Sequence, residues 1–433
     1  MPSSHLYIIG RERELNALHV IHRYWPCAGG SEKYFQEISE RLADEGHSVT
    51  VMTTDARDPE YFWLRDKDSL QLKEEMHNGV VVRRAPVQHL PMAHVLYHRT
   101  RQLMILLSGL PLDTTPILAM LSRTTPLIPT LRQQLRAAAG DADIVHVANV
   151  LLESLVAPAL DHARARDIPF VLTPFVHLGT SENDPVRQNY TNRYQLSLIK
   201  AADKVIVQTD IELRYLESKG VPGYKLVKIG VGVNPEEVLG GDGKRFREKY
   251  NLDEPIVFYI GSQSFDKGIR DLVEAMKSLW QRGSKGKLVL AGATTHHFSR
   301  YFDAQPEWVK KNCVQLGVIP DDEKRDLLAA GDVFAMPSRT DSFGIVFLEA
   351  WLYEKPVIGA LAGGIPDVVT DGKDGLIVRF GDVPHLSDCI QNLLTDSRLA
   401  QALGERGHAK VLREHTWDKK FSLIAQQYKE LGA

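Results

Sequence analysis

Short apolar runs rich in β-branched residues recur along this chain and alternate with longer amphipathic stretches. This alternation is typical of β-α-β units, which build parallel sheets with helices on their faces. The runs of the first half are LHVIH (18–22), SVTVMT (48–53), VVVRR (80–84), DIVHV (143–147), FVLT (170–173) and KVIVQ (204–208). The pattern then restarts with IVFYIG (256–261), KLVLAG (287–292), VQLGV (314–318), VFAMPS (333–338), PVIGA (356–360) and GLIV (375–378). The sequence therefore predicts an α/β protein with two β/α/β domains.

A connector separates the two sets of strands. In residues 227–244 the apolar periodicity fails while Gly, Pro and Asn cluster, as expected of a hinge. We place the boundary near residue 230, which gives an N-terminal domain of residues 1–229 and a second domain of residues 230–413. Residues 414–433 predict a terminal amphipathic helix. Residues 1–17 fit either an extra strand or a loose tail.

Charge and cysteine content exclude several classes of protein. A net charge of -3 over 433 residues gives no broad basic field, so no nucleic-acid partner is expected. Cys27, Cys313 and Cys389 are scattered and odd in number, which fits neither a disulfide framework nor a metal site. The first residues lack the pattern of a secretory leader, so we expect a cytoplasmic protein.

The region of residues 87–135 is the candidate for contact with a membrane. Its longest apolar run, residues 103–112, is about half of the ~20 residues that a spanning helix needs. Because Arg99, Arg101, Arg123 and Arg132 flank the run, the region could rest on a membrane surface as an amphipathic element. The alternative is a helical pair that covers the cleft of the N-terminal domain.

Glycine-rich fingerprints test whether the chain binds a dinucleotide or a nucleoside triphosphate. G-x-G-x-x-G fails because Pro235 stands where the third glycine would follow Gly230 and Gly232. No Gly-Lys pair is followed by the Ser or Thr of a P-loop. Gly29-Gly30-Ser31 does precede a predicted helix, where backbone amides could approach a phosphate. A tight strand-to-helix turn is the other reading of that pair.

Residues 337–378 are the most informative stretch of the chain. Asp341 lies in a polar loop after a predicted buried strand, and Phe343-Gly344 leads into a helix that carries Glu349. A carboxylate at that place can accept hydrogen bonds from the two vicinal hydroxyls of a ribose. The free amides near Gly344 and Ile345 can face a phosphate.

These residues resemble the signature of the retaining glycosyltransferases of family 4, which have the GT-B fold. The family frame is P-S-x-x-E-x-F-G-x-x-x-x-E-A, followed by G-x-P-V-x and G-G-x-P-[DE]. The matching residues here are Pro337-Ser338, Asp341, Phe343-Gly344, Glu349-Ala350, Pro356-Val357 and Gly363-Gly364-Ile365-Pro366-Asp367. Shorter family-like blocks, such as GGSE (29–32) and GSQSFDKG (261–268), extend the resemblance over most of the chain.

The resemblance implies two Rossmann-like domains facing each other across a deep cleft, with the final helix crossing back to the first domain. It implies that the second domain holds a nucleotide diphosphate sugar and the first holds the acceptor. The catalytic residues would be His177, Asp341 and Lys267. The donor-binding residues would be Gly29, Gly30, Ser262, Gln263, Lys267, Val318, Asp341, Phe343, Gly344, Ile345 and Glu349. For His177 the alternative is a loop histidine bonded to backbone.

Three departures from the family pattern bear on activity. Asp341 replaces the first signature Glu, and its carboxylate is one C–C bond, about 1.5 Å, nearer the backbone. Ser262 stands where the family has one of its two diphosphate-binding cations, which leaves Lys267. The connector around Gly230 and Gly232 is a variant that we expect to be harmless.

The function implied is transfer of a hexose, with retention, to a saccharide or lipid-linked acceptor in polysaccharide biosynthesis. The family needs no metal or other cofactor, because cationic side chains and amides stabilise the departing diphosphate. UDP-glucose is the favoured donor and GDP-mannose the second choice. A GT-B epimerase or phosphorylase and an inactive partner-binding relative are the alternatives.

Overall fold

The computed structural model describes residues 14–27, 29–138, 142–181 and 184–433. The contacts divide the chain into two compact units. The first comprises Met1–Gln102, Ala119–Thr173 and Gln427–Ala433, and the second comprises Leu103–Leu118 and Pro174–Gln426. The expected domain boundary near residue 230 stays a prediction. The expectation for residues 1–17, an extra strand or a loose tail, falls mostly outside the described residues, which begin at residue 14.

The first unit is built on a mainly parallel sheet. Its strands follow the order β3-β4-β2-β1-β5-β6, with only the β3–β4 pair antiparallel among the described strands. The strands are β1 (Asn16–Val20), β2 (Ser48–Thr54), β3 (Glu74–His77), β4 (Val80–Ala85), β5 (Ile144–Ala148) and β6 (Phe170–Thr173). Its helices are α1 (Gly30–Asp44), α4 (Leu131–Ala138), α5 (Glu153–Ala165) and the 3-10 turn η1 (Pro59–Phe62).

A buried polar cluster fastens the end of the chain to this sheet. The final helix, α19 (Trp417–Glu430), carries Tyr428, whose hydroxyl lies 2.6 Å from His146 Nδ1 and 3.2 Å from His19 Nε2. His19 and His146 stand on the neighbouring strands β1 and β5. Burial lowers the pKa of His19 to about 3, so the ring is neutral at pH 7 and serves as a hydrogen-bonding group.

The second unit contains a parallel sheet of order β11-β10-β9-β12-β13-β14. These strands are β9 (Ile256–Ile260), β10 (Lys287–Ala291), β11 (Cys313–Gly317), β12 (Val333–Met336), β13 (Val357–Ala360) and β14 (Leu376–Val378). The unit also contains β7 (Lys204–Val207) and β8 (Leu226–Lys228), which pair in parallel. The helices before β9 are α6 (Pro185–Tyr190), α7 (Arg193–Ala201), α8 (Asp210–Ser218), α9 (Pro235–Val238) and α10 (Gly243–Tyr250). The later ones are α11 (Ile269–Gln281), α12 (His296–Asp303), α13 (Glu307–Lys310), α14 (Asp321–Ala330), α15 (Ile345–Leu352), α16 (Ile365–Val368), α17 (Val383–Thr395) and α18 (Ser397–Glu414), with 3-10 turns η2 (Gly223–Lys225) and η3 (Phe265–Lys267).

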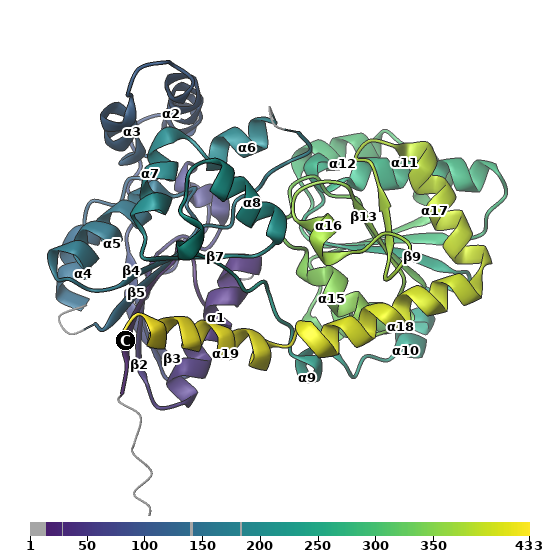
Figure 1. Ribbon diagram of the computed structural model, residues 1–433. Helices are drawn as coiled ribbons and strands as arrows, with labels where there is room; N and C mark the ends of the chain where they lie inside the picture. Colours follow the sequence, from purple (N-terminus) through teal and green to yellow (C-terminus); the bar gives the residue numbers. More distant parts are fainter. Residues whose placement is uncertain (1–13, 28, 139–141, 182–183) are drawn as a thin grey trace, which may run out of the picture. The chain divides into compact units, whose positions relative to one another are not determined.

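Helices cover both faces of the six-stranded sheet, with α11 and α17 on one side and α15 and α18 on the other (Figure 1). All five residues of β9 are buried, as its continuous apolar run requires of a strand covered on both faces. Along α11, Ile269, Leu272, Met276 and Leu279 are buried at helical spacing, and they form the stripe that meets the core. The prediction of an α/β fold with two sheets is confirmed.

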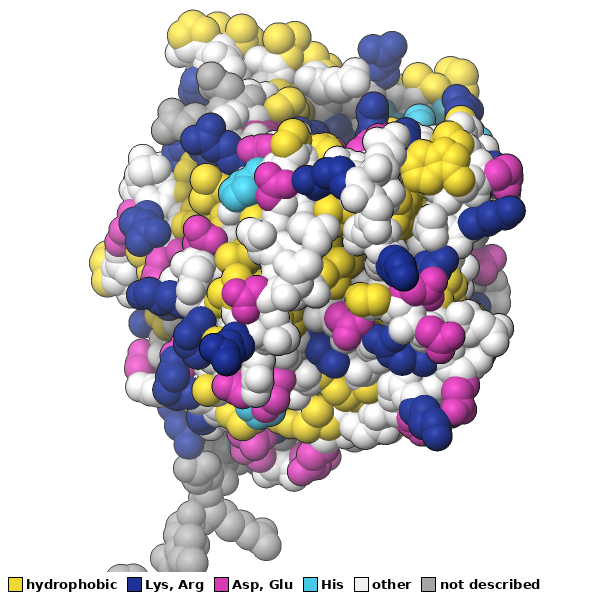
Figure 2. All heavy atoms as spheres, turned by 90° about the vertical axis from the view of Figure 1, so that its right-hand side faces the viewer, with side chains coloured by type: hydrophobic (Ala, Val, Ile, Leu, Met, Phe, Trp, Pro, Cys, Tyr) yellow, Lys and Arg dark blue, Asp and Glu magenta, His cyan; other side chains and the backbone are white. Residues whose placement is uncertain are grey.

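On the face drawn in Figure 2, acidic and basic side chains are interspersed.

Two helices in the 87–135 region expose apolar side chains. They are α2 (Ala93–Ser108) and α3 (Thr115–Ser122), joined by a short loop (Figure 1). Leu106, on α2, is 67% exposed, and Leu112, in the loop between the helices, is 69% exposed. Within the described part of the chain, no helix is both long enough and apolar enough to span a bilayer.

The residue at the glycine position of G-x-P-V-x has a strained backbone conformation. Glu354 occupies the glycine position of G-x-P-V-x and has a φ of 54°, in the left-handed region. A residue with a Cβ is disfavoured there, whereas glycine is not. The Glu354 side chain is exposed, so it offers little packing in return.

Glu354→Gly should therefore raise the free energy of unfolding by about 1 kcal/mol. Glu354→Ala is the matched control, because it removes the carboxylate but keeps the strained Cβ, and we expect no comparable gain. Urea denaturation of the three proteins measures both values. A destabilised Glu354→Gly variant would show that the side chain contributes more than its backbone strain costs.

Candidate active site

Two loops meet at the carboxyl ends of β9 and β12, the edge where parallel sheets bind ligands. One contains η3 and Gly268, and the other runs from Pro337 to Gly344. Gly268 has a φ of 74°, and a Cβ on it would lie 2.2 Å from the carbonyl oxygen of Pro337. Only glycine allows this approach. Arg339 reinforces it by donating from its side chain to Asp266 Oδ1 at 2.7 Å and from its backbone amide to Asp266 O at 3.0 Å.

This approach brings Lys267 and Asp341 together. Lys267 Nζ donates to Asp341 Oδ1 at 2.7 Å, and the two side chains are 24% and 16% exposed. Burial opposes the charged form of Asp341, but the Lys267 ammonium outweighs it and holds the pKa of Asp341 below its ordinary value. The other oxygen, Oδ2, is buried and accepts no hydrogen bond from the described residues. The carboxylate therefore keeps one acceptor position for a ligand.

His177, in the loop after β6, joins this pair. Its ring stacks on Tyr190 at 4.6 Å, and its Nδ1 is hydrogen-bonded to the carbonyl oxygen of Thr340, the residue before Asp341. Burial, and after it the positive charge of Lys267, lower the pKa of His177 to about 4. At pH 7 the ring is neutral, with its proton on Nδ1 facing the carbonyl and a lone pair on Nε2.

The G-G-I-P-D segment, residues 363–367, is hydrogen-bonded to the loop of Asp341. Gly364 N donates to Asp341 O at 2.9 Å, and Gly363 N donates to Gly179 O at 3.0 Å. A Cβ on Gly364 would lie 1.9 Å from the carbonyl oxygen of Ser342, so a side chain there would displace the loop. The second glycine of this motif is therefore needed for close backbone packing.

Glu349 lies in the second turn of α15 and is 9% exposed. Lys324, on α14, donates to Glu349 Oε1 at 2.7 Å. Its Nζ also lies 2.7 Å from Oε2, but that oxygen is among the buried atoms that accept no hydrogen bond from the described residues. Glu349 thus resembles Asp341 in being held by a lysine, but here the ammonium lies 2.7 Å from both carboxylate oxygens.

The other residues predicted to bind the donor in the second unit differ in how far they are exposed to solvent. Gly344 precedes α15 with a φ of 86°, and Ile345 is its first residue, so their amides lie at the positive end of the helix. Phe343 is buried, with its ring 5.5 Å from that of His415, so its side chain packs internally. Val318 is 77% exposed just beyond β11.

Ser262 and Gln263 follow β9. Ser262 is exposed, and its carbonyl oxygen accepts a hydrogen bond from Tyr259 at 2.6 Å. Gln263 is fully buried, and its amide bonds to Gly292 O at 3.2 Å and to Thr294 Oγ1 at 3.0 Å. In this structure Gln263 orders the neighbouring loop, and its part in donor binding stays a prediction.

Gly29 and Gly30 belong to the first unit, at the start of α1. A Cβ on Gly29 would lie 2.4 Å from Glu32 Oε2, so the glycine makes room for that carboxylate. Glu32 is buried and paired with Arg23 and, at 3.4 Å, with His22 Nε2. Its negative charge lies in the first turn, where a phosphate would have to approach. Phosphate binding by Gly29 and Gly30 stays a prediction.

Sequence reasoning missed Lys324 and Tyr190. Lys324 is 25 positions from Glu349, and the sequence offers no pattern that pairs them.

Among the described residues no three His, Cys, Asp or Glu side chains gather as metal ligands would. The expectation that the chemistry needs no metal is a separate prediction.

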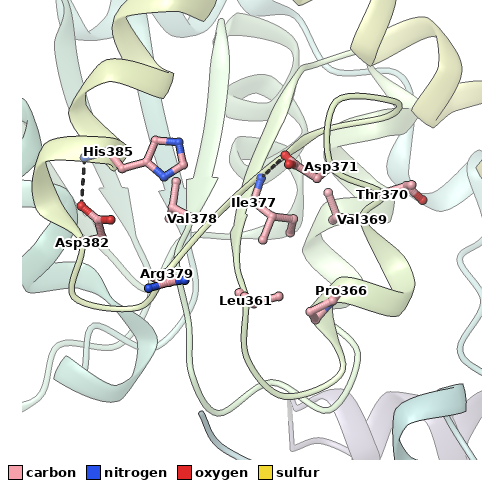
Figure 3. Close-up of a pocket in the computed structure, with 10 residues that line it drawn as sticks. All are labelled: Leu361, Pro366, Val369, Thr370, Asp371, Ile377, Val378, Arg379, Asp382 and His385. Carbon is pink, nitrogen blue, oxygen red and sulfur yellow. Dashed lines mark hydrogen bonds between the residues drawn. The ribbon is translucent and has the colours of Figure 1, made fainter. Parts of the chain in front are cut away.

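A hollow of about 400 Å³ lies at the carboxyl ends of β13 and β14. Figure 3 shows Leu361 and Pro366 on one side of it and Asp382 and His385 on the other. Lys267, Asp341 and Glu349 do not line it. This hollow is therefore distinct from the carboxylate pair.

Two family comparisons match these two halves of the sequence. Residues 29–232 match the Glycosyl transferase 4-like domain, and residues 242–410 match Glycosyl transferases group 1. The chain belongs to the GT-B glycosyltransferases of family 4. The family and the GT-B fold with its two Rossmann-like domains are confirmed.

Curated relatives place the chain within this family. It is 32% identical over 190 residues to the GDP-mannose-dependent alpha-(1-6)-phosphatidylinositol monomannoside mannosyltransferase of Mycolicibacterium smegmatis, covering 42% of this chain and 50% of that protein. It is 26% identical over 424 residues to the D-inositol 3-phosphate glycosyltransferase of Acidothermus cellulolyticus, covering 93% and 86%. The chain spans about half the length of the first of these relatives.

Solved structures share the fold. The Anabaena protein HepE in complex with UDP and glucose aligns with a TM-score of 0.71 and 16% identity, covering 96% of this chain and all, 100%, of that chain. Sucrose-phosphate synthase of Thermosynechococcus elongatus aligns with a TM-score of 0.70 and 23% identity, covering 97% and 99%. At these identities the likeness concerns the fold alone.

The pair of Lys267 and Asp341 predicts a measurable coupling. Lys267→Met should lower the free energy of unfolding at pH 7 by about 1–3 kcal/mol, because it leaves a buried carboxylate without its cation. The double variant Lys267→Met/Asp341→Asn should lose less than the two single variants together, with a coupling of about 1 kcal/mol or more. Urea denaturation measures all four proteins.

The pH dependence follows from the lowered pKa of Asp341. A carboxylate with a lowered folded-state pKa stabilises the fold above its unfolded pKa, and this contribution is lost as pH falls through the folded value. In Lys267→Met, burial without the opposing ammonium should raise the pKa of Asp341, so the stability gap to the natural protein should begin to shrink above about pH 4 and continue to shrink below it. Strict additivity at pH 7 would contradict the interpretation.

Proposed function

We propose that this protein is a retaining, metal-independent hexosyltransferase. It moves a hexose from a nucleotide diphosphate sugar to a saccharide or lipid-linked acceptor in polysaccharide biosynthesis. UDP-glucose is the first donor proposed, and GDP-mannose, which the 32% identical mycobacterial relative is named for, is the second. HepE, whose structures are titled as complexes with UDP-glucose and with UDP and glucose, supports the same class of donor.

The observation that carries the proposal is the pair of carboxylates held by lysines. Asp341 is paired with Lys267 and has a buried oxygen, Oδ2, that accepts no hydrogen bond from the described residues, whereas Lys324 lies 2.7 Å from both oxygens of Glu349. An ionised carboxylate only accepts hydrogen bonds, and its two oxygens together have about four lone-pair sites, so each of these carboxylates can still accept a bond from a hydroxyl. We assign a sugar hydroxyl of the donor to Asp341 and the ribose hydroxyls to Glu349.

Leaving-group stabilisation follows from the groups around Asp341. As the glycosidic bond breaks, negative charge grows on the diphosphate. The Lys267 ammonium has three N–H donors, of which one is used by Asp341, so the others can reach a phosphate oxygen. The amides at the start of α15 add partial positive charge. His177, neutral at pH 7, offers the Nε2 lone pair near the reacting sugar.

The two carboxylates should give opposite results when they are altered separately. Glu349→Gln should weaken binding of both UDP and GDP by roughly 10- to 100-fold, since a charge-assisted hydrogen bond contributes about 1.5–3 kcal/mol. Asp341→Asn should leave the affinity for the bare nucleotide within about twofold and reduce sugar transfer by on the order of 10²-fold. Calorimetry measures the first effect and product formation from a panel of nucleotide sugars the second.

The same panel decides between alternatives. Nucleotide release that depends on acceptor supports a transferase, an isomerised sugar nucleotide would indicate an epimerase, and phosphate-dependent release a phosphorylase. Nucleotide binding without any turnover would indicate an inactive relative. Full transfer by Asp341→Asn would remove the carboxylate from the sugar site, and Ser342 or the amides that open α15 would have to replace it.

We also propose that this protein is cytoplasmic and binds peripherally to an anionic membrane surface through its α2–α3 region. Between residues 87 and 136 the sequence has five arginines and a single acidic residue, Asp113. Arg101 is buried against Glu153 and Arg132 is paired with Asp161, so the attraction to lipid would rest mainly on Arg99, Arg123 and Arg136. The same region exposes a run of large apolar side chains: Leu90, Met92, Val95, Leu96, Leu103, Leu106, Leu110, Leu112, Ile117 and Met120. Apolar insertion and attraction to anionic lipid act together in such elements.

Leu106→Glu/Leu112→Glu should reduce binding to vesicles containing anionic lipid at least tenfold, since each leucine that enters the lipid interface contributes about 1.5–3 kcal/mol. The matched control is Leu72→Glu/Met76→Glu, whose side chains are 61% and 67% exposed outside this region. Vesicle flotation with anionic and with neutral lipid measures the binding. Equal flotation of both double variants would contradict the proposal.

A further inference from the structure

Glu212 is a buried carboxylate that the proposed reaction does not use. It lies in the first turn of α8 and is 2% exposed. Its Oε1 accepts a hydrogen bond from Val176 N at 2.9 Å, and its Oε2 accepts one from Gln208 N at 2.8 Å. Both oxygens are thus occupied by backbone amides, one at the end of β7 and one in the loop after β6.

The loop after β6 needs such a tie. Phe175 has a φ of 49°, which is a strained conformation for a residue with a side chain. Val176 follows it and His177 comes next, so the amide held by Glu212 is one residue from the histidine. Strained backbone persists only where its surroundings hold it. The Glu212 carboxylate is therefore one of the groups that fix the direction in which His177 points.

The same turn of α8 also contacts the other side of the site. Ile211 N donates to Asp367 Oδ2 at 2.6 Å, and Asp367 ends the G-G-I-P-D segment that supports Asp341. Gly364, in that segment, donates to Asp341 O at 2.9 Å. One helical turn thus connects the backbone beside His177 with the backbone beneath Asp341.

We propose that Glu212 is a positioning residue for sugar transfer, whose ionised carboxylate holds His177 in register with Lys267 and Asp341 and whose protonation releases it. The proposal rests on the transferase function proposed above and deepens it. Protonation converts one oxygen from an acceptor into a donor, so it can no longer accept an amide hydrogen. One of the two ties is then lost.

Burial raises the pKa of Glu212 to about 7, although the bonds from Gln208 and Val176 oppose this shift. The other ionisable groups on the elements around it are Asp210, Arg214, Tyr215 and Glu217 on α8, Lys204 on β7, Lys228 on β8, Lys420 on α19, Asp367 across the Ile211 bond and His177 beside Val176. His177 has a pKa of about 4, so the two groups titrate in separate ranges. Activity should therefore fall as pH drops through about 7, well before His177 gains a proton.

The sign of the stability effect is opposite. A carboxyl whose folded-state pKa is raised binds its proton more tightly in the folded state, so its contribution to stability increases as pH falls from about 7 towards its unfolded value. A residue that only supports the fold would lose activity and stability together. For Glu212 the two should diverge.

The experiment compares Glu212→Gln with Glu217→Gln, an exposed glutamate on the same helix. At pH 8, Glu212→Gln should lower kcat by on the order of 10- to 100-fold, because a misplacement of about 1 Å has that effect. The donor KM and the affinity for nucleotide should stay within about twofold. The urea midpoint should stay the same or rise. The fall of activity near pH 7 should disappear. Glu217→Gln should match the natural protein in every measurement.

A readout without turnover separates this proposal from the proposed function. In ¹⁵N-histidine NMR, the His177 signals, assigned by their absence in His177→Gln, should shift in Glu212→Gln and not in Glu217→Gln. If no donor is turned over but these signals shift, the transferase function fails and the positioning role stands. Unchanged His177 signals, an unchanged kcat, or loss of nucleotide binding together with turnover would each overturn the positioning role.

Discussion

The ion pair between Lys267 and Asp341 is the interaction on which the rest of the site depends. It joins a loop after β9 to a loop after β12, and the two residues are 74 positions apart. Their charges lie 2.7 Å apart only because Gly268 lets one loop touch the backbone of Pro337 and Gly364 lets a third loop support Ser342. The glycines of the family motif are thus requirements of backbone packing, and the carboxylates can act only where that packing places them.

Much of this arrangement could be predicted from the sequence. The buried runs of β9, β12 and β13 follow from continuous apolar residues, which only a strand covered on both faces tolerates. The carboxyl ends of parallel strands share one edge, so the loop of Lys267 and the loop of Asp341 had to approach each other. The position of Glu349 in the second turn of α15 follows from counting along the helix.

The side-chain partners could not be predicted, because they depend on contacts between distant segments. Nothing in the order of residues pairs Lys324 with Glu349 or places Tyr190 against the ring of His177. For the same reason the sequence indicates Gln263 as a donor-binding residue but not that its amide is bonded to Gly292 and Thr294. Glu212 escaped notice because a single glutamate at the start of a helix usually serves the helix dipole. Its link to Val176 exists only in three dimensions.

The shorter acid at position 341 and the missing cation at position 262 are better understood together. With Ser262 in place of a cation, Lys267 is the one side-chain cation left in the segment of residues 261–268, and it is already bonded to Asp341. In the proposed reaction one ammonium must therefore bridge the carboxylate and the diphosphate. It can do so only if the acid stays close to its own backbone and leaves the outward N–H groups of the lysine uncovered. An aspartate, whose carboxylate lies about 1.5 Å nearer its backbone than that of a glutamate, meets that condition.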